Sequence, residues 1–437
     1  MKTWIALLTL PLTLSSVSYG QAVPTAVATP GPSTKLSPVD GVVHYALNAS
    51  DLVQIGQYNS GELTNAVSLS GDIAYESKNI AKPFTMLYAG GVLFSNEYGY
   101  GTTTFQNFAI SQGLVTRNWV FGVSDSVSYL PQSPTTGLSG IPGVGDLGAV
   151  PIEGGPTLGP AGGVLSYASD RVANSLNGNV ERRLTANTSV SGSAAWSILR
   201  YINNNGIDNT EVSAQGGVNH RIDARDSVSA NGTYSTFTYD SVGNNFHTDG
   251  VNGHFQRLLS RTLTMDVSAG PEWITSSNTA LIPSRVIVAA NVGLSYQRRY
   301  TNARVNFSRG VNGGSGVQPG ALSNSVSAAA GRTWGRDWVA AASATYTYTS
   351  GLIQNGTTIT PTGTATPIFT NGTSKTFYGG VQVTRRLSNY LSGFVSYTAQ
   401  NQSITGSLAE QNAFSGLAQT FGIGITFTPR STRLGQF

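Results

Sequence analysis

The chain has 437 residues, 11% of them charged, with 25 Lys and Arg against 21 Asp and Glu. Charged residues form roughly a quarter of an ordinary soluble domain, so this composition is unusual for a soluble protein of this length. The small positive balance does not indicate nucleic-acid binding, because the arginines gather at turns rather than on one face. The absence of cysteine excludes a disulfide framework and a thiolate metal site.

The N-terminus predicts export from the cytoplasm. Residues 1–20 have a positive Lys2, an apolar run and small residues ending at Gly20, which is the pattern of a signal peptide cut after Gly20. Residues 21–41 are rich in Pro, Ala, Thr and Ser and predict a flexible periplasmic leader. No later segment has the run of about 18 apolar residues that a spanning helix needs.

Eight short polar turns recur over residues 42–437, most of them bearing arginine. They are centred near Asn79, Arg117, Leu184, Asp223, Leu259, Tyr300, Trp334 and Leu387. Two of the intervals between successive turns contain long Gly/Pro/Thr segments. The other intervals indicate a repeating unit of about 38 residues. Such a unit fits one hairpin of two long strands, with a short turn at one end and a longer loop at the other. After a signal peptide, this pattern predicts a transmembrane β-barrel.

Apolar and small polar residues alternate between the turns. One predicted strand has an apolar face and a polar face, formed by Leu263, Met265, Val267, Ala269 and Trp273 and by Thr264, Asp266, Ser268, Gly270 and Glu272. A period of two over ten or so residues predicts a long strand with one wet and one greasy face. Aromatic residues near the ends of the apolar faces suggest two girdles at the lipid headgroup level.

The predicted fold is all-β: an antiparallel up-and-down transmembrane barrel with short periplasmic turns and longer extracellular loops. Two strands for each short turn give about 16 strands. A first strand near 42–55 and a last strand near 413–427 raise the number to about 18, which is even, as bacterial barrels require. Asp51 interrupts the apolar face of the first strand, which keeps 16 open.

The turn arginines admit two interpretations. The favoured one is interfacial anchoring, in which guanidinium groups pair with lipid phosphates while their stems cover the apolar edge. The expected partners of the barrel surface are outer-membrane lipids and lipopolysaccharide. The other is a basic vestibule that gathers anions. The residues concerned are Arg182, Arg183, Arg298, Arg299, Arg385 and Arg386.

The predicted lumen is lined mainly by Ser, Thr, Asn, Gln, Ala and Gly. Its occasional acids, Asp72, Glu211, Asp266 and Glu272, are the candidate selectivity residues. No arginine ladder faces a cluster of acids, as a charged constriction would require. The sequence therefore predicts a neutral or weakly cation-preferring lumen. The alternative is that Asp266 and Glu272 merely pair with residues on neighbouring strands.

A long loop, residues 130–163, is the candidate constriction. Its Gly and Pro content opposes strand pairing, yet its apolar residues are too many for a freely solvated loop. The residues expected to narrow the pore are Leu138, Ile141, Val144, Asp146 and Leu147. Covering a subunit interface, or lying over the rim, are the alternatives for this loop.

Asp125 falls on the apolar face of its strand at mid-length. A charge facing lipid there costs on the order of 2–4 kcal/mol, somewhat less for an acid. A local bulge is the preferred explanation, and a protomer contact or a different register are the alternatives.

Catalysis is not expected. His247 and Asp249, with Asp240 near Ser241, fall in or near a predicted outer loop, whereas hydrolysis needs a fixed base, nucleophile and orienting acid. No metal-ligand spacing or nucleotide fingerprint is present, so no cofactor and no metal are predicted.

The chain resembles Gram-negative outer-membrane β-barrel proteins over residues 42–437. Its Arg-bearing turns and Ser/Thr/Asn-rich strands look like those of large barrels encoded beside exopolysaccharide and exosortase systems. The resemblance implies recognition by the barrel-insertion machinery through an aromatic-ended last strand. Phe437 is terminal, but STRLGQF does not alternate and the clean alternation stops at Phe427, so the signal is expected to be internal.

These observations predict an outer-membrane pore for diffusion of small hydrophilic solutes, narrowed by the 130–163 loop. A structural or accessory barrel of a polysaccharide export system is the alternative. A soluble β-propeller is a third possibility, since its blades also repeat near 40 residues, but four strands per period do not fit. A homo-oligomer is possible as a partner arrangement, and no nucleic acid is expected.

Overall fold

The structure is a computed structural model, and it describes residues 41–56, 63–96, 102–131, 170–202, 207–239, 245–279, 281–315, 318–353, 372–405, 415–429 and 432–434. The predicted signal peptide, nearly all of the leader, the five residues of the predicted constriction loop and the terminal Phe437 lie outside these ranges. Within them, no helix has the length and apolarity to cross a membrane.

The described residues form eighteen long strands and one short one. These are β1 (Gly41–Gly56), β2 (Leu63–Ser77), β3 (Phe84–Ser95), β4 (Thr102–Val115), β5 (Trp119–Pro131), β6 (Asp170–Arg183), β7 (Thr188–Tyr201), β8 (Asn209–Arg221), β9 (Asp226–Tyr239), β10 (Phe246–Ser260), β11 (Leu263–Ser276), β12 (Arg285–Arg298), β13 (Thr301–Ser315), β14 (Gln318–Trp334), β15 (Trp338–Gly351), β16 (Thr373–Arg386), β17 (Leu391–Thr405), β18 (Gly416–Phe427) and β19 (Thr432–Leu434).

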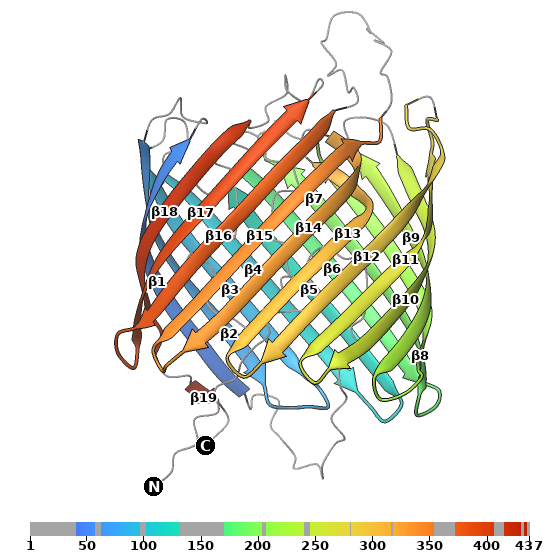
Figure 1. Cartoon of the computed structure of the whole chain (residues 1–437), viewed down its shortest axis with the longest axis horizontal. Helices are drawn as coiled ribbons and strands as arrows, with labels where there is room; N and C mark the ends of the chain where they lie inside the picture. The colour runs from blue at the N-terminus through green and yellow to red at the C-terminus, as the bar shows by residue number, and fades with distance from the viewer. Residues whose placement is uncertain are drawn as a thin grey trace, which may run out of the picture.

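The sheet closes on itself. Each long strand pairs antiparallel with its chain neighbours, and β18 pairs with β1 from Leu47↔Phe427 to Gly56↔Ala418 (Figure 1). The short β19 extends this closing seam, with Leu434 opposite Gly41. The prediction of an eighteen-stranded up-and-down barrel is confirmed, and the sixteen-stranded and propeller alternatives are wrong. The described part of β1 begins at Gly41, one residue before the start predicted for the barrel at residue 42.

The eight predicted turns all join consecutive strands at one end of the barrel, where β1 begins and β19 lies (Figure 1). Bacterial barrels place short turns in the periplasm. The turn after β8 shows why they are tight: Asp223 Oδ1 accepts the backbone N–H groups of Arg225 and Asp226 at 2.6 and 2.8 Å. These hydrogen bonds lower the pKa of the Asp223 carboxyl.

The two faces of the wall differ as the alternation predicts. Apolar side chains point outward and are well exposed, as at Leu47 (60%) and Ile423 (62%), whereas the intervening polar side chains point inward, as at Gln54 and Ser68. Outside a cluster at the long-loop end, the inward side chains of the described residues are mainly small or polar, so the outer surface is suited to lipid and the inner one to water.

Asp125 faces outward as its parity predicts, but the expected bulge is wrong. Its pairs with β4 and β6 run in unbroken register, opposite Ile110 and Leu176. Instead, Asn174 on the same outer face donates its amide to Asp125 Oδ1 at 2.9 Å. The carboxylate therefore meets a neighbouring-strand amide rather than bare lipid. Asp51 has the same arrangement, accepting the amide of Asn65 at 2.7 Å.

Candidate functional site

The wall divides where β13 leaves β12. The last pair between these strands is Ala290 with Arg309. β12 stays paired with β11 up to Arg285, and β13 stays paired with β14 up to Ser315. Beyond the last pair, each strand carries a backbone edge that pairs with no strand of the described residues. We call this divergence the fork.

Above the fork, the end of the β13–β14 hairpin lies inside the barrel. We call residues 310–315 and 318–321 the inward tip. The Tyr239 hydroxyl at the end of β9 donates to the Gly313 carbonyl oxygen at 2.8 Å and accepts the backbone N–H of Gly320. Asn209 at the start of β8 donates to the same Gly313 oxygen at 3.5 Å. Since Tyr239 and Asn209 face the lumen, these contacts place the tip across it.

Glu272 binds the tip from β11. Its carboxylate accepts hydrogen bonds from the Thr248 hydroxyl and from the backbone N–H of Val311. Two edge groups of β13, the Val311 N–H and the Gly313 carbonyl, are therefore bonded by lumen side chains in place of a neighbouring strand. This substitution satisfies backbone groups that would otherwise be left without a partner.

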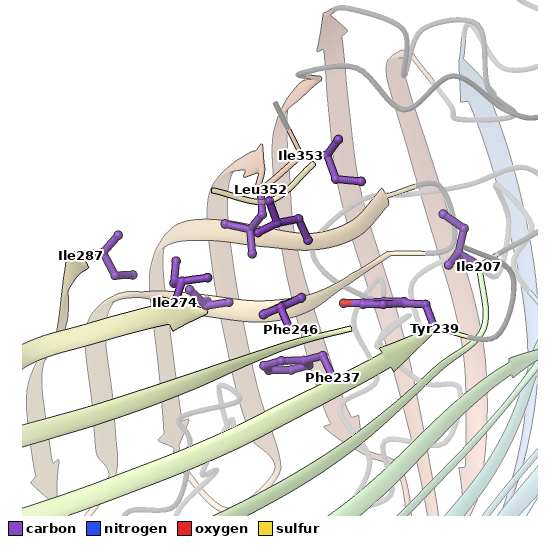
Figure 2. Close-up of a cluster of buried hydrophobic side chains, with 10 residues drawn as sticks. Ile207, Phe237, Tyr239, Phe246, Ile274, Ile287, Leu352 and Ile353 are labelled. Atoms are coloured by element: carbon purple, nitrogen blue, oxygen red, sulfur yellow. The ribbon is translucent and has the colours of Figure 1, made fainter. Parts of the chain in front are cut away.

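An apolar cluster packs around the tip at the long-loop end of the barrel (Figure 2). This mouth cluster consists of Ile207, Phe237, Tyr239, Phe246, Ile274, Ile282, Ile287, Val311, Leu352 and Ile353, each at most 9% exposed. The Phe237 and Phe246 rings stack with centroids 4.6 Å apart. These side chains come from β9 to β13, from the segment before β8 and from the segment after β15, so the cluster fixes the tip against several parts of the wall.

Two glycines allow the tip to approach these rings. A Cβ on Gly313 would lie 3.3 Å from Phe237 Cδ1, and one on Gly320 would overlap the Phe246 ring. Gly320 also has φ +64°, which L side chains rarely adopt. The local sequence is thus suited to close contact between backbone and aromatic rings.

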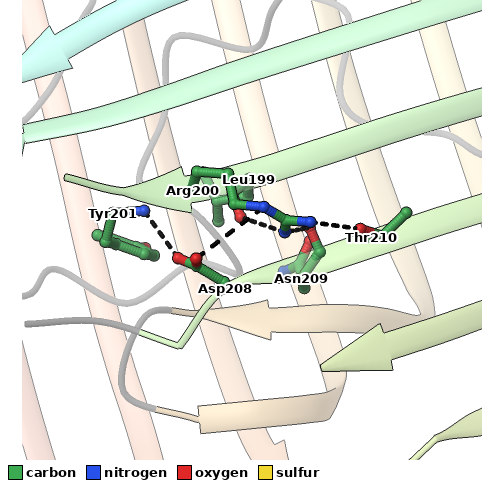
Figure 3. A network of polar contacts seen from close by, with 6 residues as sticks. All are labelled: Leu199, Arg200, Tyr201, Asp208, Asn209 and Thr210. Atoms are coloured by element: carbon green, nitrogen blue, oxygen red, sulfur yellow. Dashed lines mark hydrogen bonds and ion pairs between the residues drawn. The ribbon is translucent and has the colours of Figure 1, made fainter. Parts of the chain in front are cut away.

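A polar network holds the rim beside the tip (Figure 3). Arg200 donates to the Asn209 carbonyl oxygen at 2.8 Å and to the Thr210 hydroxyl at 3.0 Å. Asp208 accepts the Tyr201 backbone N–H at 2.8 Å. These bonds tie the end of β7 to the start of β8, the strand from which Asn209 reaches the tip.

Arg309 bridges the fork on the outer face. Its Nε donates to the Val288 carbonyl oxygen at 3.2 Å, and its Nη1 donates to Asn324 Oδ1 at 3.0 Å. Val288 lies on β12 just beyond the last pair with β13, so the guanidinium occupies a carbonyl on the open edge. Arg309 therefore joins β12 to β14 where the ladder ends.

The four predicted lumen acids all have inward parity. The structure brings Glu272 into the site, and it places Glu211 close enough to Tyr239 to interact with it electrostatically. Asp266 faces the lumen lower on β11, and Asp72 is buried on β2, away from the tip. Inward-facing Arg171 and Arg285 near the mouth were not singled out from the sequence.

Three of the six turn arginines stack on aromatic rings at the short-turn end. Arg182, Arg299 and Arg385 lie 5.1, 4.9 and 5.2 Å from ring centroids, over Trp119, Tyr300 and Trp338 respectively. Arg386 instead donates to the Ser388 carbonyl and the Asn389 side chain in its own turn. Arg183 and Arg298 end their strands at the same level.

The weak catalytic cluster is not assembled in the described residues. His247 and Asp249 lie 3.7 Å apart but on the outward face of β10, while Asp240 and Ser241 fall outside the described ranges. No group of three or more metal-ligating side chains occurs among the residues described.

Sequence reasoning missed Phe237, Tyr239 and Phe246. One available signal was their parity: they are large aromatic residues at positions that otherwise carry small polar side chains toward the lumen. A second was the glycine-rich end of the β13–β14 hairpin, which begins at Gly310.

No protein-family model matches the sequence, and no curated protein matches it. Solved structures similar to this chain include Pseudomonas aeruginosa OpdQ, with 9% identity, TM-score 0.41 and coverage of 91% of this chain and 100% of that one. P. aeruginosa OccK2 (OpdF) in complex with glucuronate has 9% identity, TM-score 0.43 and coverage of 90% and 98%. The P. aeruginosa outer membrane protein opdK has 9% identity, TM-score 0.43 and coverage of 89% and 99%. At these values the similarity does not extend to substrate or activity.

The architecture itself defines the setting. Only helices and closed barrels satisfy every backbone group within lipid, and bacterial outer-membrane barrels have an even number of antiparallel strands, short turns at one end and an outward-facing apolar band. The eighteen-stranded closed wall with apolar side chains outside is therefore an outer-membrane β-barrel of a Gram-negative bacterium.

Proposed function

We propose that this protein is an outer-membrane pore for small hydrophilic solutes, narrowed at its extracellular mouth by the inward tip. The observation that carries the proposal is the closed wall of eighteen strands whose inward side chains are mostly small and polar. A barrel of about this strand number leaves an aqueous channel unless something folds into it.

The inward tip supports a restricted rather than a wide-open mouth. It crosses toward β8 and β9 and is bonded by Tyr239 and Glu272 from two different strands. The mouth cluster is packed and apolar. A solute that enters from outside therefore passes beside it, through the polar remainder of the lumen. The predicted 130–163 loop remains a second candidate for narrowing the same channel.

The lumen charge supports a weak preference for cations. Asp72, Glu211, Asp266 and Glu272 face inward along the wall. Arg171 and Arg285 face inward near the mouth, and Arg304 faces inward nearer the short turns. Separated charges of both signs bias ions without forming a selective filter. The solute class that fits is neutral to weakly cationic.

The test is the conductance of the refolded protein in a planar lipid bilayer, with the reversal potential measured under a salt gradient. Discrete steps with a reversal potential on the cation side are expected. Folded protein that inserts, yet passes no current at any voltage the bilayer tolerates, would contradict the pore. No observation on the described residues favours an accessory barrel of polysaccharide export.

A further inference from the structure

We propose that the inward tip is a gate with two positions. One is the observed position in the mouth. In the other, β13 continues its ladder on the open edge of β12, so that the tip joins the wall and the mouth widens. This inference rests on the proposed pore function, and it adds the moving element and its second set of contacts.

The register of the second position follows from the pairs below the fork. The pairs of β12 with β13 run without a break from Arg298↔Thr301 to Ala290↔Arg309, so each step back along β12 is one step forward along β13. Continued in the same register, Val288 lies opposite Val311 and Val286 lies opposite Gly313. Both strands are already long enough for these pairs, since β12 extends to Arg285 and β13 to Ser315.

The side chains of the tip fit a wall position. The period of two runs through the fork: Val311 and its β14 partner Leu322 continue the lipid-facing row, and Asn312 and Ser323 continue the lumen-facing row. The same Val311 is 1% exposed in the mouth cluster. Its apolar side chain is therefore buried in one position and faces lipid in the other, and both are favourable environments.

The open edge of β12 lies within the apolar band. Val286 and Val288 point outward and are 59% and 58% exposed, and Val286 pairs with outward Trp273, a residue type of the headgroup level. The last pair of the fork is four residues below Val286, which is about 10 Å at the usual strand rise and tilt. An unpaired backbone edge in lipid is costly, so a state that pairs it gains free energy.

Single side chains hold the backbone groups that this pairing requires. Arg309 occupies the Val288 carbonyl, Glu272 occupies the Val311 N–H, and the Tyr239 hydroxyl occupies the Gly313 carbonyl. Moving the tip exchanges side-chain hydrogen bonds for ladder hydrogen bonds of similar strength. Two packings that give these three backbone groups different partners are what a two-state element requires.

Gly310 is suited to be the hinge. It is the first residue of β13 beyond the last pair with β12, and a Cβ built on it meets no atom within 4 Å. A glycine there gives the chain the conformational freedom that a swing of the tip requires.

The chain has no native cysteine, so disulfides can trap either position. Gly313→Cys with Val286→Cys reports the wall position, because Gly313 now contacts Phe237 on the inner face of β9 whereas Val286 faces outward on β12. Gly313→Cys with Phe237→Cys holds the mouth position. Ala303→Cys with Ala330→Cys, on an intact rung of β13 and β14, is the matched control. Disulfide formation is read by gel mobility, and conductance is read before and after reduction.

We expect the 286–313 pair to form and to raise conductance about twofold or more until it is reduced, because a barrel of this size is wide when nothing folds into it. We expect the 237–313 pair to hold the low conductance and the control pair to change nothing. Failure of the folded 286–313 variant to cross-link, or a cross-link that leaves conductance unchanged, overturns the gate. If cross-linking occurs but the uncross-linked wild-type protein and every variant are silent in the bilayer, the pore function fails while the movement of the tip stands.

Discussion

Removing the Tyr239 hydroxyl is the sharpest perturbation of the mouth. In Tyr239→Phe the ring remains, and with it the packing against Phe246 at a centroid distance of 6.2 Å. The substitution removes the hydrogen bond to the Gly313 carbonyl and the one from the Gly320 N–H. Only the bonds that hold the tip are lost.

The magnitude follows from these two bonds. Each hydrogen bond contributes about 1 kcal/mol net, so the observed position loses about 2 kcal/mol relative to any position in which Tyr239 does not hold the tip. A difference of 1.4 kcal/mol is tenfold, so about 2 kcal/mol shifts the ratio of the two positions about thirtyfold. The wider state should therefore be populated correspondingly more often.

The assay is single-channel recording in a planar bilayer, scored as the fraction of time in the larger-conductance state. Tyr234→Phe is the matched control, since it removes the same group from the same strand but on the outward face, where Tyr234 is 44% exposed. A Tyr239→Phe channel with wild-type occupancy of the two states, or an equal effect of Tyr234→Phe, would refute the reasoning.

Three further changes test the charge, the turns and the tip. Asp266→Asn should move the reversal potential toward the anion side because it removes a lumen charge, whereas Asp125→Asn, on the outer face, should leave it unchanged; a shift in both or neither contradicts this. Asp223 has a folded pKa below the unfolded value of about 3.9, so its stabilising effect is present above that pH and is lost as pH falls through the folded pKa. Melting temperature against pH should accordingly fall more steeply between about pH 5 and 2 for the wild type than for Asp223→Asn, and parallel curves would be inconsistent with this. Gly320→Ala should resemble Tyr239→Phe in recordings because the φ of +64° and an adjacent aromatic ring oppose a Cβ, while Gly335→Ala, at φ +66° in a short turn with open space, should not.

Most of the barrel could be predicted because its rules are local. Along β12, Val288, Val292 and Leu294 alternate with Ala289, Asn291 and Gly293, and this pattern assigns these side chains to lipid or lumen. The turns are equally local, as the Asp223 hydrogen bonds show. Strand number then follows from counting, since each short turn requires two strands.

The inward tip could not be predicted because its pattern suits two environments. Val311 has the parity of a lipid-facing residue, and nothing within β13 distinguishes that from burial in the mouth. The decision is made by Tyr239, Phe237 and Glu272, which lie far from it in the sequence. The prediction of a bulge at Asp125 was wrong for a related reason. Its partner Asn174 is 49 positions away in the sequence, and it hydrogen-bonds to Asp125 across the strands without disturbing the register.

The β1–β18 seam has a consequence for assembly. Leu47 and Phe427 are directly paired although 380 positions separate them, whereas every other long-strand pair joins neighbours along the chain. The sixteen intervening strands can form by successive hairpins, but the ring cannot close until the last long strand has left the ribosome and crossed the inner membrane. Until then, both terminal strands present open edges, the form of a sheet most prone to pairing with the wrong chain. Closure of the ring is therefore the one long-range pairing step among the long strands, and β19 lengthens that seam by the pairs from Gly41↔Leu434 to Val43↔Thr432.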